Sequence, residues 1–137
     1  WSANSLPKSG ADSIWSYELD TAAATPYPLH NHRTRAAAAE HLTERVEHHR
    51  GRRVLLGCDF AFGYPAGFAR AAGLLGTPGV AAWAATWSYL GVALTDDERN
   101  RNNRWQVAAD LNERLGANLF WGVPRSRAGR WITPPGS

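Results

Sequence analysis

The sequence of 137 residues contains no methionine, a single cysteine and a single lysine. It also lacks any run of about twenty apolar residues, which excludes a membrane-spanning helix. No basic segment followed by an apolar one opens the given sequence, so we expect no signal peptide in it. One cysteine excludes a disulfide framework and fits a reducing compartment, so we expect a cytoplasmic protein. Trp1 opens the chain without an initiator and residues 133–137 have linker composition, so we expect it to be incomplete at both ends.

What is present is typical of one globular domain, residues 1–137. Hydrophobic residues make up 44% of the chain and charged residues 20%, which excludes a disordered tail or a fibrous repeat. The formal net charge is +3, and arginine supplies fourteen of the fifteen basic residues. Such arginine use, beside many alanines and glycines, is typical of a GC-rich genome, so it says little about partners.

The first regular element we expect is a strand over residues 13–19. Apolar Trp15, Tyr17 and Leu19 alternate with polar residues, as in an antiparallel strand that is buried on one face. We expect its partner to be the segment around Trp1, in an opening hairpin.

A helix is predicted over residues 34–50. Four consecutive alanines favour it, and Ala38, Leu42 and Val46 recur at helical spacing, which indicates a buried stripe. Gly51 stands where a helix C-cap is expected.

The apolar run over residues 53–60 does not alternate and is bounded by turn signals, so we expect a strand buried on both faces at the centre of the sheet. Helices are predicted over residues 68–72, 79–93 and 95–115, the last from a capping box. Residues 118–122 are a possible final strand. Together these elements predict an α/β fold with a mixed sheet, a buried central strand and flanking helices.

Asp59 is the first candidate functional residue, because a carboxylate at the carboxyl end of a buried strand lies where α/β sheets bind ligands. Its alternative role is to accept hydrogen bonds from the turn that follows. Beside it, Gly63 and Tyr64 begin a sharp turn in which the backbone can approach a ligand closely. A sharp turn without a ligand favours the same residue types.

The segment 100–104 is the second candidate. On a helix from residue 95, Asn100, Asn103 and Arg104 would project near the buried face formed by Val107 and Leu111. Polar groups in line with a buried stripe either satisfy one another in a polar core or line a ligand pocket. Both alternatives stay open at this point.

The histidines and tryptophans favour structural roles. His30 and His32 have a spacing used in metal sites, but no further zinc pattern accompanies them, and surface positions are the better interpretation. Cys58 is expected to pack as a small apolar residue. Trp83 and Trp87 are expected in a core or in an interface between subunits, so a homo-oligomer can form through their helix.

Four blocks in order, at residues 1–15, 59–68, 100–104 and 120–122, resemble a family of uncharacterised bacterial proteins. Its members are often named after cobalamin or molybdopterin-cofactor biosynthesis, and their strand motifs are similar to those of predicted nucleases of the ribonuclease H-like superfamily. The resemblance runs along most of the chain and implies a ribonuclease H-like fold.

The resemblance also implies a chemistry. Ribonuclease H-like enzymes hold two divalent ions, Mg²⁺ or Mn²⁺, on carboxylates, and the ions clamp the attacking and leaving oxygens of a phosphodiester. Asp59 matches the acid at the end of the central strand and would be both metal ligand and catalytic residue. The first acid of the pattern would precede Trp1, and further acids would follow the present C-terminus.

Three functions are therefore compared. The first is a metal-dependent phosphodiesterase or phosphoryl-transfer domain that uses Asp59. The second is a non-catalytic domain that binds a small anion, such as a nucleotide, at the Asn/Arg segment, and nucleic acid is a further possible partner of such a site. The third is a structural domain that oligomerises through Trp83 and Trp87.

Overall fold

The computed structural model describes residues 6–23, 25–59, 63–76 and 78–136. The chain divides into two compact units: unit 1 contains residues 1–60 and 96–101, and unit 2 contains residues 61–95 and 102–137. The fold is mixed α/β with small antiparallel strand pairs. The elements of unit 1 are β1 (Ile14–Ser16), β2 (Leu19–Asp20), β3 (Thr25–Pro26), β4 (His30–His32) and α1 (Arg35–His48). The helices of unit 2 are α2 (Phe68–Ala71), α3 (Ala82–Ala93), α4 (Arg104–Leu115) and a 3-10 turn (Arg125–Arg127).

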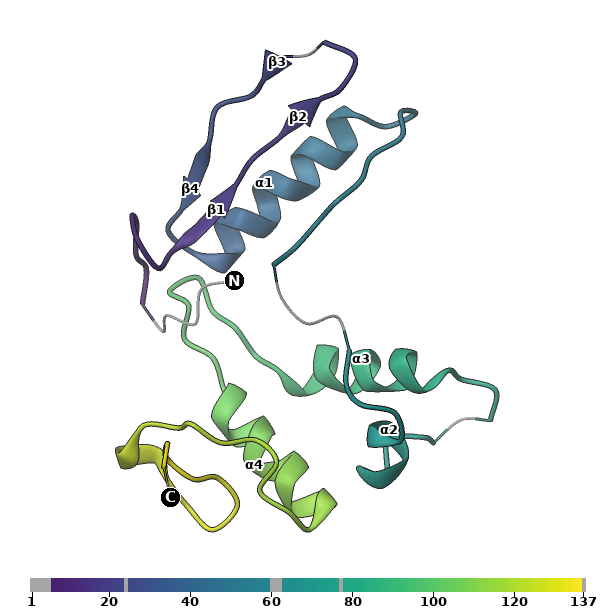
Figure 1. Cartoon of the computed structure of the whole chain (residues 1–137), viewed down its shortest axis with the longest axis vertical. Coiled ribbons are helices and arrows are strands. Elements are labelled where there is room, and N and C mark those ends of the chain that lie inside the picture. Colours follow the sequence, from purple (N-terminus) through teal and green to yellow (C-terminus); the bar gives the residue numbers. More distant parts are fainter. Residues whose placement is uncertain (1–5, 24, 60–62, 77, 137) are drawn as a thin grey trace. The chain divides into compact units, whose positions relative to one another are not determined.

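Two antiparallel ladders form the β structure of unit 1. Strand β1 pairs with β4, with Trp15 opposite Asn31, and β2 pairs with β3. The partner of the first strand is thus a later segment, whereas the expected partner at Trp1 lies outside the described residues. Figure 1 shows α1 running along these ladders, and its packing is against β1 and β4.

The face of the first strand that looks apolar in the sequence is the exposed one. Trp15, Tyr17 and Leu19 are 48%, 59% and 54% exposed, so the predicted orientation was wrong. The opposite face is held to α1 by polar contacts instead, among them the ion pair of Glu18 with Arg45. Alternation located the two faces, and the face that carries Glu18 is the one that contacts α1.

The predicted helix over residues 34–50 is confirmed as α1. The Thr34 hydroxyl accepts a hydrogen bond from the amide of Ala37 at 3.1 Å and so caps the helix. Ala38 is buried, but Val46 is 42% exposed, so the buried stripe is shorter than expected.

The predicted central strand over residues 53–60 is not found. Residues 53–59 belong to no strand, and Leu55 is 96% exposed. An unbroken apolar run indicates that a segment can be buried but does not supply partner strands, and neither ladder of unit 1 includes this segment. The ribonuclease H-like sheet therefore stays a prediction.

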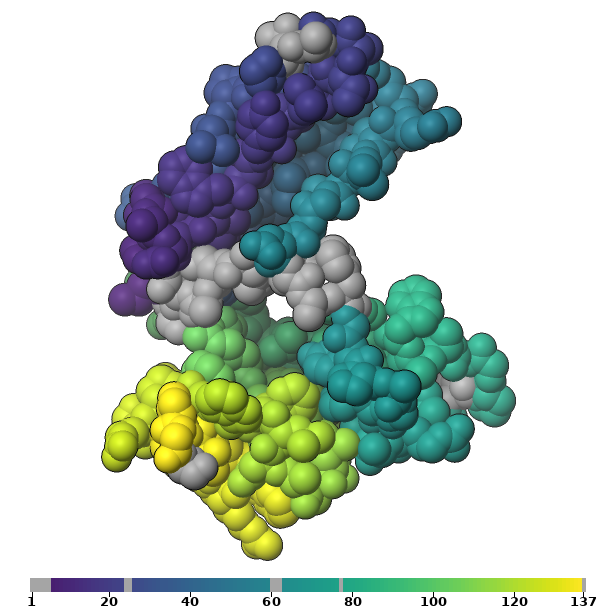
Figure 2. Space-filling view, viewed as in Figure 1, coloured from purple at the N-terminus to yellow at the C-terminus, as the bar shows by residue number. Residues whose placement is uncertain are grey.

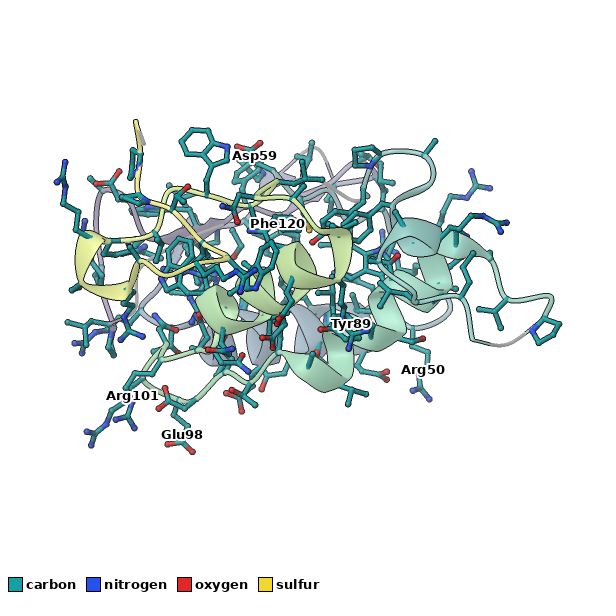
Figure 3. The ribbon with its side chains drawn as sticks, turned by 90° about the horizontal axis from the view of Figure 1, so that it is seen from below. Arg50, Asp59, Tyr89, Glu98, Arg101 and Phe120 are labelled. Atoms are coloured by element: carbon teal, nitrogen blue, oxygen red, sulfur yellow. The ribbon has the colours of Figure 1, made fainter. Side chains whose placement is uncertain are left out.

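The core of unit 2 joins its three helices. Phe68, Ala72, Leu90, Val107 and Leu111 form the buried cluster, and it confirms the apolar face predicted for the last helix. Phe120 packs against this cluster and is seen beside α4 in Figure 3.

The last helix begins at Arg104, nine residues after the expected start at residue 95. Asn100 has a φ of 63°, in the left-handed region, and this conformation cannot continue a right-handed helix. Residues 96–101 form a loop instead, in which the Asp97 carboxylate accepts hydrogen bonds from the amides of Arg99 and Arg101. Figure 3 shows Glu98 and Arg101 pointing outward from this loop. The predicted final strand at residues 118–122 is irregular chain.

Within the described residues, no helix has both the length and the apolar character needed to cross a membrane.

Candidate functional site

The candidate site of unit 2 depends on one buried side chain of α4, that of Asn112. This residue has no exposed surface. Its Nδ2 donates hydrogen bonds to the carbonyls of Phe120 at 2.8 Å and Trp131 at 2.6 Å, and its Oδ1 accepts one from the amide of Phe120 at 2.9 Å. Asn112 therefore fixes two separate points of the C-terminal segment on the helix.

Backbone hydrogen bonds close the C-terminal segment on itself. The amide of Gly122 donates to the carbonyl of Thr133 at 2.9 Å, and Gly129 forms an isolated bridge with Ile132. Val123 has no exposed surface and Ile132 only 4%, so the loop has a small apolar centre. Figure 2 shows this segment, in yellow, in contact with the yellow-green surface of α4.

A hollow of about 500 Å³ lies between α4 and this segment; we call it the indole pocket. Two indole rings line it, Trp105 from the first turn of α4 and Trp131 from the loop. Its remaining lining residues are Asn102, Asn103, Gln106, Ala109, Asp110, Glu113, Arg127, Gly129, Arg130 and Ile132. Volumes of about 300–1,000 Å³ are typical of small-molecule sites.

The charges of the indole pocket are divided between its two sides. Arg127 and Arg130 come from the C-terminal loop, whereas Asp110 and Glu113 come from α4. The Arg130 guanidinium lies over the Trp131 ring, 5.0 Å from its centroid. Asp110 accepts a hydrogen bond from the side-chain Nε2 of Gln106 at 2.8 Å. The pocket is thus lined by anion-binding arginines from the loop, hydrogen-bond acceptors from α4 and two tryptophans.

The predicted segment 100–104 belongs partly to each unit: Asn100 lies in unit 1, and Asn103 and Arg104 lie in unit 2. Asn100 is 1% exposed, and its Oδ1 accepts from the amide of Arg35 at 2.8 Å while its Nδ2 donates to the carbonyl of Arg33 at 3.2 Å. Arg35 in turn forms an ion pair with Asp96 and donates to the carbonyl of Asn100 at 2.6 Å. Of the two alternatives open in the sequence, Asn100 shows the polar network.

Asn103 and Arg104 belong to unit 2 and lie at the start of α4. Asn103 lines the indole pocket, although its side chain also binds backbone: it accepts from the amide of Thr95 and donates to the carbonyl of Ala93, both at 2.8 Å. The Arg104 guanidinium lies 4.7 Å from the centroid of Trp105. Arg104 therefore supports one wall of the pocket rather than lining it.

The other predicted site residues lie outside the indole pocket. Asp59 is exposed and stands in irregular chain, not at the end of a strand. Gly63 is exposed as well. Tyr64 stacks on Phe68 with ring centroids 4.4 Å apart, and burial raises the pKa of its hydroxyl. Tyr64 thus joins the aromatic edge of the core.

Within the described residues, no group of three or more His, Cys, Asp or Glu side chains is arranged to hold a metal ion. The α3 side chains Trp83 and Trp87 are 68% and 40% exposed. They are not core residues, and their role in an interface between subunits stays a prediction.

No protein-family model, curated protein or solved structure matches this chain.

Sequence reasoning missed Trp105, Trp131 and Asn112. Asparagine is a poor residue for a helix interior, so its position in the middle of the last predicted helix was a usable signal. Nothing local in the sequence shows that this amide binds the carbonyl of a residue nineteen positions later.

Proposed function

We propose that unit 2 is a non-catalytic binding module that takes a nucleotide in the indole pocket. The observation that carries the proposal is that Trp105 and Trp131 share one hollow with two arginines and two carboxylates. Each of these groups recognises a different part of a nucleotide.

The indoles suit the base. An aromatic side chain that stacks on a nucleobase contributes about 1–3 kcal/mol per base. The carbonyl of Trp131 accepts the hydrogen bond from buried Asn112, so the loop that carries this ring is held in place before a ligand arrives. A ring positioned in advance loses less conformational entropy when the ligand binds.

The arginines suit the phosphate. A guanidinium presents a planar set of donors that matches phosphate oxygens, and Arg127 and Arg130 lie on the same side of the pocket. Arg130 also lies over Trp131, so a phosphate-binding group and an indole are neighbours in the pocket.

The carboxylates suit the edge of a base. Asp and Glu accept hydrogen bonds from exocyclic amino groups of nucleobases. Asp110 and Glu113 line the helix side of the pocket, so a base with an amino group, such as adenine, is favoured over uracil.

The metal-dependent phosphodiesterase stays a prediction from the family resemblance. In this sequence, Asp59 is the one residue matched to the metal-binding acids that the resemblance implies. Catalysis with two metal ions needs several carboxylates around one centre, and Asp59 stands exposed in irregular chain.

Calorimetric titration of the whole chain with AMP tests the proposal, with EDTA present so that metal chemistry does not contribute. We expect saturable binding that is weaker for UMP, and weaker again for adenosine or for ribose 5-phosphate, each of which lacks one of the recognised parts. Trp131→Ala should weaken AMP binding about tenfold, the equivalent of one lost stacking contact.

Two exposed residues of the same segment provide matched controls. Trp121 is 64% exposed and Arg125 precedes Arg127 in the 3-10 turn, and neither lines the pocket. Trp121→Ala and Arg125→Ala should bind AMP as the parent chain does, whereas Arg130→Ala should lose affinity. The absence of AMP binding by the folded parent chain would overturn the proposal, as would equal losses in Trp131→Ala and Trp121→Ala.

A further inference from the structure

Three histidine rings of unit 1 pack together where β1 and β4 lie on α1. The ring centroids of His30 and His41 are 4.5 Å apart, those of His32 and His41 are 5.0 Å apart, and those of His30 and His32 are 6.2 Å apart. Strand β4 carries His30 and His32 on one face because they are two residues apart, and α1 supplies His41. We call these three residues the histidine cluster.

His32 is the buried member of the histidine cluster, with 8% of its surface exposed. Its Nε2 lies 2.7 Å from the Ser16 hydroxyl, so the hydrogen bond joins β4 to β1 at the surface that faces α1. Burial, followed by the nearby His41 and His30, lowers the pKa of His32 below its ordinary value of 6.5. The site therefore favours the neutral ring.

No carboxylate offsets a charge on this ring among the groups that act on it. His41 from α1 and His30 from β4 both oppose protonation of His32, and β1 contributes the neutral Ser16.

The two arginines of α1 are already paired. Arg35 forms an ion pair with Asp96, and Arg45 forms one with Glu18, so both carboxylates are engaged. A second or third imidazolium in the cluster would meet like charge at close range, which is destabilising.

We propose that the histidine cluster is a pH-sensitive latch, which holds the β1–β4 ladder against α1 at neutral pH and releases it in mild acid. The direction follows from proton linkage. A histidine that resists protonation in the folded state binds more protons when the ladder opens. The stability it contributes is complete above pH 6.5, the ordinary pKa of the ring, and is lost as the pH falls below that value.

Each proton taken up on opening raises the opening equilibrium constant by up to about tenfold per pH unit. Glu18 acts in a different range, since its pKa lies at about 2 and its contribution is lost only below its ordinary 4.5. The two effects are therefore separable by pH.

Amide hydrogen exchange of the whole chain at about pH 7.5 and about pH 5.5, corrected for the intrinsic pH dependence of exchange, tests the latch. We expect the opening constant of the β1 and β4 amides to rise about tenfold in acid. His41→Gln, which removes one ring of the cluster, should show a smaller rise. His48→Gln, on the same helix but exposed and outside the cluster, should match the parent chain.

A second measurement does not depend on any variant. Titration of the histidine ring resonances of the parent chain by NMR should place the midpoint of His32 below 6.5. A midpoint at or above that value would overturn the proposal, as would the same pH response in all three chains. The last measurement adds Zn²⁺ at neutral pH and follows hydrogen exchange of the β1 and β4 amides. If Zn²⁺ slows this exchange and the effect requires all three histidines, the cluster is a metal site and the latch proposal is overturned.

Discussion

The side-chain amide of Asn112 donates a hydrogen bond to the main-chain carbonyl of Trp131 at 2.6 Å. This contact joins the middle of α4 to the C-terminal loop. Trp131 lines the indole pocket from that loop, and Trp105 lines it from the helix. The position of one indole relative to the other therefore depends on the buried side-chain amide of Asn112, which binds the main chain of Trp131.

The first prediction concerns this amide. Asn112→Ala leaves the carbonyls of Phe120 and Trp131 and the amide of Phe120 without their partner in a buried place, so unit 2 should lose about 3–5 kcal/mol of stability. Chemical denaturation measures the loss. Asn118→Ala is the control, because Asn118 reaches the carbonyl of Arg130 from an exposed position and its removal should cost less than about 0.5 kcal/mol. Similar losses in both variants would contradict this role for Asn112.

The second prediction concerns Asn100 in unit 1. Asn100→Ala removes the side-chain hydrogen bonds to Arg35 and Arg33 and places a residue with a Cβ but no polar group at a φ of 63°. Together these changes should destabilise unit 1 by about 2–4 kcal/mol. The neighbouring exposed Arg99→Ala should change stability by less than about 0.5 kcal/mol. If Asn100→Ala leaves the denaturation midpoint unchanged, the polar network has no structural importance.

The third prediction concerns acid stability. The Arg45 guanidinium and then His49 hold the pKa of Glu18 at about 2, below its ordinary 4.5. An acid with a lowered pKa stabilises the fold above its unfolded-state pKa, so this contribution is complete above pH 4.5 and is lost as the pH falls toward 2.

Replacement of Glu18 by Gln tests that window. Glu18→Gln should cost about 1–2 kcal/mol at neutral pH and should flatten the stability profile below pH 4.5. Glu47→Gln, from an exposed pair with Arg50, should leave the profile as it is. A Glu18→Gln profile with the full slope of the parent chain would mean that other groups cause the acid response.

Helices whose ends depend on local chemistry were predictable from the sequence. The alanine run and the helical spacing of apolar residues gave α1 almost to its ends, and the apolar period of Val107 and Leu111 gave the buried face of α4. The start of α4 was not predictable from its capping box. The left-handed Asn100 held by Arg35 interrupts the helix, and that contact spans 65 residues of sequence.

Strand assignments failed where they needed distant partners. The run containing Leu55 is as apolar as a buried strand, but burial requires neighbouring strands that this segment does not have. Trp15 lies on an apolar face that turns outward because the other face makes ion pairs with α1. The prediction of the site also lacked distant contacts. Asn103 was predicted as a ligand-binding residue and lines the indole pocket, but the pocket depends on the contact of Asn112 with a loop nineteen residues later.

The most direct test of the nucleotide-binding proposal is an NMR titration of the tryptophan indole N–H resonances with AMP, assigned by single Trp→Phe variants. The account predicts that the signals of Trp105 and Trp131 move together and saturate, whereas the signal of exposed Trp121 stays in place. Unchanged Trp105 and Trp131 signals in the presence of excess AMP would contradict it.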